Sequence, residues 1–201
     1  MHLSEREVVA MLVAVSFAAG LNVYATVATL GLLSHAGALT LPPNLTPLAS
    51  WWVIGASAVL FGVEFFADKV PAFDLVWNAL HTFVRIPVAA LLAYQATAAL
   101  SPLERIGVTL AAGSIALVAH GGKTAMRAAV TPSPEPLSNV TLSMGEDMLA
   151  VFLTWLATRH AELAAGIVVL FLLATLMMIR WVLRALRRLF GGAEWAIEGS
   201  S

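Results

Sequence analysis

The sequence predicts an all-α membrane protein, a polytopic bundle of about six transmembrane helices. The 201 residues are 60% hydrophobic and only 11% charged, whereas soluble domains have about 25% charged residues. Mean hydropathy is +0.87. A helix needs about 20 apolar residues to cross a bilayer core of roughly 30 Å. Six segments meet or approach this length: about 8–33, 51–67, 86–100, 106–127, 148–157 with its flanks, and 163–183.

The placement of charge supports six crossings. An even number puts both termini on one side, and the positive-inside rule makes the side of the arginine-rich tail cytoplasmic. Of the 11 Lys and Arg residues, only Arg105 and Arg159 then fall outside. We therefore expect both termini to be cytoplasmic, residues 1–190 to form one transmembrane domain and residues 191–201 to form a flexible tail. The tail is expected to contact anionic lipid headgroups through Arg180, Arg184, Arg187 and Arg188.

Composition and motif searches exclude several classes of function. The chain has no cysteine, so disulfides and thiolate metal sites are excluded, and its net charge of −1 argues against a nucleic-acid partner. The five histidines show no metal-ligand spacing, and no serine-hydrolase elbow is present. We assign no catalytic residue, metal or cofactor. The N-terminus lacks a small-residue cleavage site, so we expect the first apolar segment to stay as a span.

Three Ser-x-x-Glu patterns precede apolar runs and predict helix N-termini: Ser4–Glu7, Ser101–Glu104 and Ser143–Glu146. The pattern assigns all three glutamates to caps. The next residue, Asp147, is either a favourable charge at a helix N-terminus, which we favour, or another inward-facing acid.

A weak internal echo suggests a 3+3 inverted repeat, an architecture of secondary transporters. Residues 18–20, Ala-Ala-Gly, reappear as residues 111–113. The matches involve common small residues, so a bundle without a repeat remains the alternative.

Two polar stripes remain unexplained by caps or hydrophobicity. They lie near the inner ends of the second and fourth spans and consist of Glu64 with Asp68, and of His120 with Lys123 and Arg127. Each has helical spacing, which puts its members on one face. An ionised acid in hydrocarbon costs about 2.5 to 3.5 kcal/mol on insertion scales. We therefore expect the acids to pair with Lys123 and Arg127, while Lys69 extends to the headgroups.

Residues 71–87 predict an amphipathic helix before the third span. Asp74, Asn78, His81 and Arg85 form its polar stripe. This helix either lies flat on the inner leaflet or continues into the third span with its polar stripe facing a water-filled vestibule.

Asn22 and Tyr24 lie near the middle of the first span, beside Gly20. Asn22 either bonds across closely packed helices or lines a pathway. Both alternatives remain open.

Several motifs together resemble those of the domain of unknown function 4126 family of small bacterial integral membrane proteins. They are residues 20–24, Glu64 to Asp74, His81 to Pro87, Ser133 to Asn139 and Ser143 to Asp147. The resemblance covers about residues 16–157. It implies a membrane location, expected to be the bacterial inner membrane, and no particular activity.

The leading functional hypothesis is a transporter or channel for a small ion or polar solute, with a mixed-charge site on the cytoplasmic side. The alternative is a scaffold or assembly factor that binds anionic lipid; an enzyme acting on lipid phosphates is less favoured because no nucleophile-base spacing is visible. Self-association is left open. The expected pathway residues are Asn22, Tyr24, Glu64, Asp68, Lys69, Asp74, His81, Arg85, His120, Lys123, Arg127 and Asp147.

Overall fold

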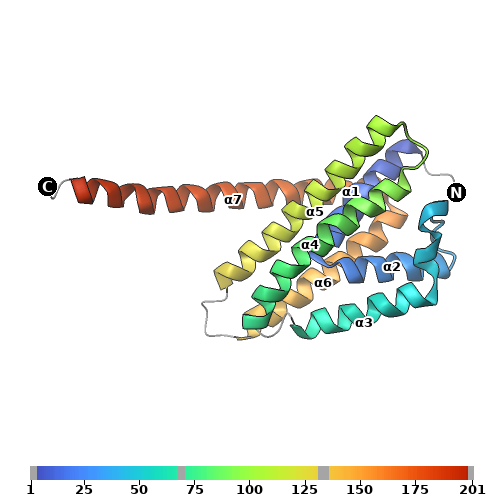
Figure 1. The fold of residues 1–201 in the computed structure, drawn as a ribbon, viewed down its shortest axis with the longest axis horizontal. Helices are drawn as coiled ribbons and strands as arrows, with labels where there is room; N and C mark the ends of the chain where they lie inside the picture. The colour runs from blue at the N-terminus through green and yellow to red at the C-terminus, as the bar shows by residue number, and fades with distance from the viewer. Residues whose placement is uncertain (1–3, 68–70, 131–135, 199–201) are drawn as a thin grey trace.

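The computed structural model describes residues 4–67, 71–130 and 136–198, and these form helices without a strand (Figure 1). The all-α prediction is confirmed. The elements are α1 (Glu5–Leu21), α2 (Val23–His35), the 3₁₀ helix η1 (Pro43–Ala49), α3 (Trp51–Ala67), α4 (Pro71–Ala96), α5 (Pro102–Val130), α6 (Pro136–Arg159) and α7 (Ala161–Glu198).

Several helices are long and apolar enough to cross a membrane. Among the described residues there are four, in α4, α5, α6 and α7. A fifth is formed if η1 and α3, which are bent by 63° relative to each other, act as one span. The protein is therefore an integral membrane protein by length and composition of its helices, whereas six crossings and the inverted repeat are not confirmed.

The predicted first span, residues 8–33, is two helices that meet at Asn22. This residue has an extended backbone (φ −150°, ψ 103°), and its N–H donates to Ala18 O at the end of α1. Its side-chain oxygen accepts from Ala25 N at 2.9 Å and so caps the start of α2. Because Asn side chains compete for backbone hydrogen bonds, this residue ends one helix and begins another. The prediction of one continuous helix is wrong.

The two halves of this segment fold back on each other. Figure 1 shows α1 entering the bundle from the end where the chain begins, and α2 returning from Asn22 towards that end. The buried cluster around Met11, near the start of α1, includes Leu41 and Leu45 from the segment after α2. The segment from α1 to α2 therefore enters and leaves at one end of the bundle.

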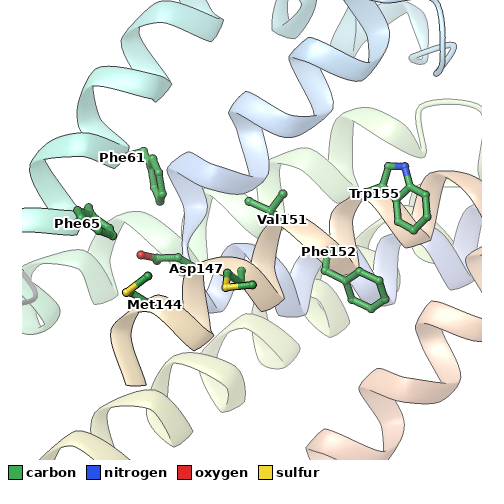
Figure 2. Close-up of a pocket in the computed structure, with 8 residues that line it drawn as sticks. Phe61, Phe65, Met144, Asp147, Val151, Phe152 and Trp155 are labelled. Carbon is green, nitrogen blue, oxygen red and sulfur yellow. The ribbon is translucent and has the colours of Figure 1, made fainter. Parts of the chain in front are cut away.

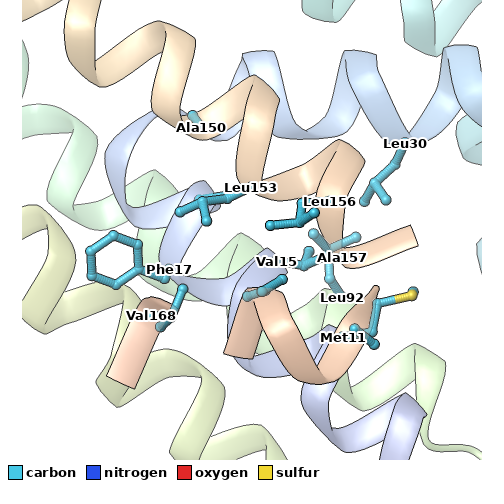
Figure 3. Close-up of a cluster of buried hydrophobic side chains, with 14 of the residues drawn as sticks. Met11, Val15, Phe17, Leu30, Leu92, Ala150, Leu153, Leu156, Ala157 and Val168 are labelled. Atoms are coloured by element: carbon cyan, nitrogen blue, oxygen red, sulfur yellow. The ribbon is translucent and has the colours of Figure 1, made fainter. Parts of the chain in front are cut away.

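Helix α1 forms the centre of the bundle and packs against α4, α5, α6 and α7. Leu12 packs with Ala112 of α5 and, further along, Ala19 packs with Ala116, so α1 and α5 run parallel. Figure 3 shows the main cluster, in which side chains of α1 such as Val15 and Phe17 lie among residues of α2, α4, α6 and α7.

Helix α4 turns its polar face inwards. Asn78, His81 and Arg85 are buried, whereas Phe83 is 81% exposed and Leu80 is exposed as well. A soluble helix has the opposite arrangement, because its apolar face packs on the core. The predicted amphipathic helix and the third span are one continuous helix, with Pro87 inside it, so the polar stripe enters the bundle.

Two of the three predicted caps are confirmed. Ser4 and Glu7 form a complete capping box, and the bonds from the Ser4 backbone N–H and hydroxyl hold the pKa of the Glu7 carboxyl below its ordinary value. Ser101 and Glu104 exchange the same bonds before α5. The cap at Ser143–Glu146 is wrong, because α6 already begins at Pro136.

Helix α7 continues past residue 190 to Glu198 and extends beyond the other helices (Figure 1). Arg180, Arg184 and Arg187 are exposed on this extension, while the side chain of Arg188 lies outside the described ones. The division into residues 1–190 and a flexible tail stays a prediction, as does the contact with anionic lipid.

The folding back of α1 and α2 makes a prediction about sidedness. Because the chain has no cysteine, single cysteines can be introduced without background. Arg6→Cys and Ala36→Cys should react with a membrane-impermeant maleimide from the same side of the membrane. If η1 and α3 act as one span, α3 to α7 make five crossings, and Arg184→Cys should react from the opposite side. Labelling of Arg6→Cys and Ala36→Cys from opposite sides in oriented vesicles would show that α1 and α2 cross together.

A second prediction concerns the close approach of α1 to α5. A Cβ atom on Gly20 would lie 2.5 Å from Ala116 O and 2.7 Å from Ala119 Cβ. Gly20→Ala should therefore destabilise the bundle by about 1 to 3 kcal/mol through overpacking, measured as a lower Tm in detergent. Gly55→Ala is the matched control, because nothing lies within 4 Å of its Cβ position, and it should leave the Tm unchanged or slightly raised.

Candidate functional site

Buried charged side chains from four helices meet inside the bundle. Glu64 of α3 forms an ion pair with Arg85 of α4, and both side chains are 0% exposed. The same oxygen of Glu64, Oε1, lies 3.6 Å from Lys123 Nζ of α5. Lys123 Nζ in turn lies 3.4 Å from Glu146 Oε2 of α6. We call these four residues the charge chain, because positive and negative groups alternate along it.

The helix break lies beside the charge chain and supplies it with polar groups. Lys123 Nζ donates to the carbonyl of Leu21, the last residue of α1, at 3.3 Å. Asn22 Nδ2 donates to Asp147 Oδ1 of α6 at 2.8 Å. A cation thus lies at the carbonyl end of α1 and an anion beside the amide end of α2, which is the arrangement that helix dipoles favour. Discontinuous helices bind ions and substrates in this way in many secondary transporters.

The contacts of Arg85 fix the tautomer of His120. Arg85 Nη1 donates to His120 Nδ1 at 2.8 Å and to Asn78 Oδ1 at 3.3 Å. Arginine has no acceptor, so Nδ1 of His120 must be unprotonated and Nε2 must carry the hydrogen. Nε2 then donates to Thr82 Oγ1 at 2.8 Å, and Thr82 donates to Asn78 O. His120 is held neutral as long as Arg85 stays in place.

Neutral His81 has the other tautomer, with its hydrogen on Nδ1, because it contacts a carbonyl and a hydroxyl. Its Nδ1 lies 2.8 Å from Trp77 O and therefore donates. Its Nε2 lies 3.0 Å from the hydroxyl of Tyr24, which is partly exposed. In neutral His81 the Tyr24 hydroxyl donates to Nε2, and protonation reverses that bond. The Tyr24–His81 pair can therefore change protonation state without losing its hydrogen bond.

The structure brings together most of the predicted site residues that it describes. Glu64 and Lys123 meet, as the two polar stripes predict, and Arg85 joins them. Asp68 and Lys69 lie outside the described residues, and the side chains of Asp74 and Arg127 lie outside the described side chains. The role of all these residues in a pathway stays a prediction.

Sequence reasoning missed the part that α6 plays. The Ser-x-x-Glu pattern predicts a capping role for Glu146, whereas in the structure Glu146 pairs with Lys123 inside the bundle. Asp147, favoured as a charge at a helix start, is buried and bonded to Asn22. Ser143 and Ala150 are buried on the same face. The spacing of residues 143, 146, 147 and 150 carries the signal for one inward face of a longer helix.

The described residues contain no group of three His, Asp or Glu side chains that could hold a metal ion. An open cavity of about 510 Å³ lies beside Asp147, between α3 and α6 (Figure 2). Apart from Asp147, aromatic, methionine and valine side chains line it.

Comparison with known proteins places the chain in a family. The model of the domain of unknown function DUF4126 matches residues 9–181. The chain therefore belongs to this family. No curated protein and no solved structure matches it.

The charge chain predicts a non-additive effect on stability. Arg85→Gln should lower the free energy of unfolding by about 3 to 5 kcal/mol, because it leaves a buried carboxylate with one cation fewer. Adding Glu64→Gln should recover part of this loss, since no unpaired charge then remains between α3 and α4. Thermal unfolding in detergent tests the cycle, with exposed Arg159→Gln as the control. Strictly additive effects of the two substitutions would contradict the coupling.

Proposed function

We propose that this member of the DUF4126 family is a transporter or channel for a small ion or polar solute, with Glu64 as its central ion-binding carboxylate. The observation that carries the proposal is the charge chain, which lies inside an apolar bundle beside a broken helix. Ionisable residues in the membrane interior are costly and mark ion pathways in many membrane proteins.

The bonding of Glu64 supports a role in binding. Its Oε1 is shared by Arg85 and Lys123, while its Oε2 is buried and has no hydrogen-bond partner among the described residues. A carboxylate with one unused oxygen can accept a proton or a cation. Purely structural ion pairs are most stable when every oxygen is satisfied, so this geometry favours exchange over a fixed scaffold.

Lys123 can exchange between two carboxylates. It lies between Glu64 and Glu146, at 3.6 and 3.4 Å, so small shifts change which carboxylate it neutralises. A proton or cation that binds Glu64 would weaken the ion pairs of Glu64 with Lys123 and Arg85. Release of Arg85 would in turn free Nδ1 of His120 to accept a proton. The Tyr24–His81 pair, with its partly exposed hydroxyl, is the proposed proton relay to the surface.

We further propose five crossings, α3 to α7, in the bacterial inner membrane, with α1 and α2 as a re-entrant segment. Irregular backbone at membrane depth is tolerated where it lines a cavity or is buried in protein, as Asn22 is. An odd number of crossings puts the termini on opposite sides, in place of two cytoplasmic termini. The arginines near the end of α7 then keep the C-terminus cytoplasmic and near anionic lipid.

The second candidate function is a lipid-binding scaffold, and the extension of α7 favours it. Arg180, Arg184 and Arg187 are exposed there. This function predicts that Arg184→Gln with Arg187→Gln lowers the amount of anionic lipid that co-purifies, while ion movement is absent from the unmodified protein.

Flux in proteoliposomes tests the proposed function. The unmodified chain should move protons, followed with an internal pH dye, or monovalent cations faster than protein-free liposomes. Glu64→Gln and Lys123→Met should each lower the rate at least tenfold, because each removes a member of the charge chain, whereas exposed Arg159→Gln should not. If ions and small solutes move no faster than in protein-free liposomes, the transporter or channel function is contradicted. The lipid-binding scaffold is then the remaining candidate function.

A further inference from the structure

We propose that an acyl chain of a bilayer phospholipid occupies the cavity between α3 and α6 and holds α3 against the bundle. The cavity binds the chain of the lipid, whereas the arginines of α7 would contact the charge of a headgroup. This inference goes beyond the proposed function and does not depend on it, because it concerns lipid binding and holds whether or not the protein moves ions.

The cavity is elongated along α6 (Figure 2). The lining on this side is one face of the helix over about three turns: Met144, Asp147, Met148, Val151, Phe152 and Trp155. Residues 144 to 155 extend over about 16 Å, at a rise of 1.5 Å per residue. The hydrocarbon core is roughly 30 Å thick, so the chains of one leaflet fill about 15 Å. The lining therefore matches the length of one acyl chain, whereas a compact ligand would contact only part of it.

The position of α3 leaves the cavity open at the side. Helix α3 packs chiefly against α2 and hardly touches α6. Figure 2 shows Phe61 and Phe65 on α3 at this space, and its volume of about 510 Å³ falls in the range of about 300 to 1,000 Å³ that is typical of ligand sites. Since α6 and the pair of η1 and α3 are candidate spans, the medium that reaches an opening between them is hydrocarbon.

The walls favour an uncharged, apolar ligand. Apart from Asp147, aromatic, methionine and valine side chains line the cavity. Asp147 is only 5% exposed and has partners inside the bundle, among them Asn22 Nδ2 at 2.8 Å, so it needs no counter-charge from a ligand. A hydrated ion would lose its water against such walls, which is costly. Met144 and Met148 are flexible side chains that can adapt to a hydrocarbon chain of variable conformation.

A chain in this cavity supplies packing contacts that the protein itself lacks. Helix α3 carries Glu64 of the charge chain, yet few residues of α4 and hardly any of α6 contact this helix. Side chains beside an unfilled space lose the dispersion contacts that a close-packed neighbour would give them. Because a ligand that binds only the folded state stabilises it, the bound chain should stabilise the native position of α3.

Thermal unfolding of the full chain in detergent, with increasing amounts of dioleoylphosphatidylcholine, tests the inference. This lipid has no net charge, so the arginines of α7 do not select it. We expect the Tm to rise and then to saturate. Val151→Trp fills the cavity with a side chain and should make the rise in Tm at least threefold smaller. Val59→Trp is the matched control, because Val59 is 67% exposed on α3 and does not line the cavity, and it should keep the full rise.

A phosphatidylcholine with a photoreactive diazirine in its acyl chain locates the site on the unmodified protein, so the inference stays testable if Val151→Trp does not fold. Met148 and Met177 are 68% and 67% exposed, and of these two Met148 alone lines the cavity. Adducts at Met148 should exceed those at Met177 at least threefold, and excess unlabelled lipid should abolish the difference. Equal labelling of the two methionines, or an equal rise in Tm in the two tryptophan variants, would overturn the inference.

Other occupants of the cavity would give different results. If a detergent tail fills it as well as a lipid chain does, added lipid leaves the Tm unchanged. If a second copy of the protein covers it, Met148 is labelled less than Met177. Either result contradicts the inference. Ion flux in the same proteoliposomes tests the proposed function separately: preferential labelling of Met148 without flux would remove the proposed function alone, and flux with equal labelling would remove this inference alone.

Discussion

The ion pairs of Glu64 with Arg85 and Lys123 determine where α3, α4 and α5 meet inside the bundle. Charges buried this deeply are tolerated only when opposite charges and polar groups surround them. Four helices must therefore bring one member each of the charge chain to the same depth. The break at Asn22 lies at this depth, and it adds a carbonyl for Lys123 and an amide for Asp147. The register of the whole bundle follows from this meeting point.

The surface of the bundle follows from the same constraint. Since polar residues of α4 and α6 face inwards, their apolar residues face outwards, where lipid is the solvent. Small residues then set how closely the helices pack, because lipid gives apolar side chains no reason to prefer the protein interior. Gly20 shows this at the contact of α1 with α5, where even a methyl group would clash with Ala116.

Asn22 and the inner face of α6 connect the charge chain to the cavity between α3 and α6. Glu146 belongs to the charge chain, and its neighbour Asp147 reaches the cavity between α3 and α6. Asn22 holds Asp147 and at the same time caps α2. Asp147 is therefore bonded to the residue at which α1 ends and α2 begins. The charge chain and the cavity are adjacent, and the break between α1 and α2 lies beside both.

The sequence alone determined the class of the protein, the spacing of its inward polar stripes and the helix starts at Ser4 and Ser101, because composition, periodicity and caps are local properties. It also indicated that Glu64 and Lys123 would pair, since neither can remain alone in hydrocarbon. Only the tertiary structure decided that Asn22 breaks the first segment, that α2 turns back and that Glu146 faces Lys123. These features depend on contacts between residues far apart in the chain, such as Asn22 with Asp147. A polar residue inside an apolar segment satisfies the same local rules whether the helix continues or breaks, and the partner that it meets across the bundle determines which of the two occurs.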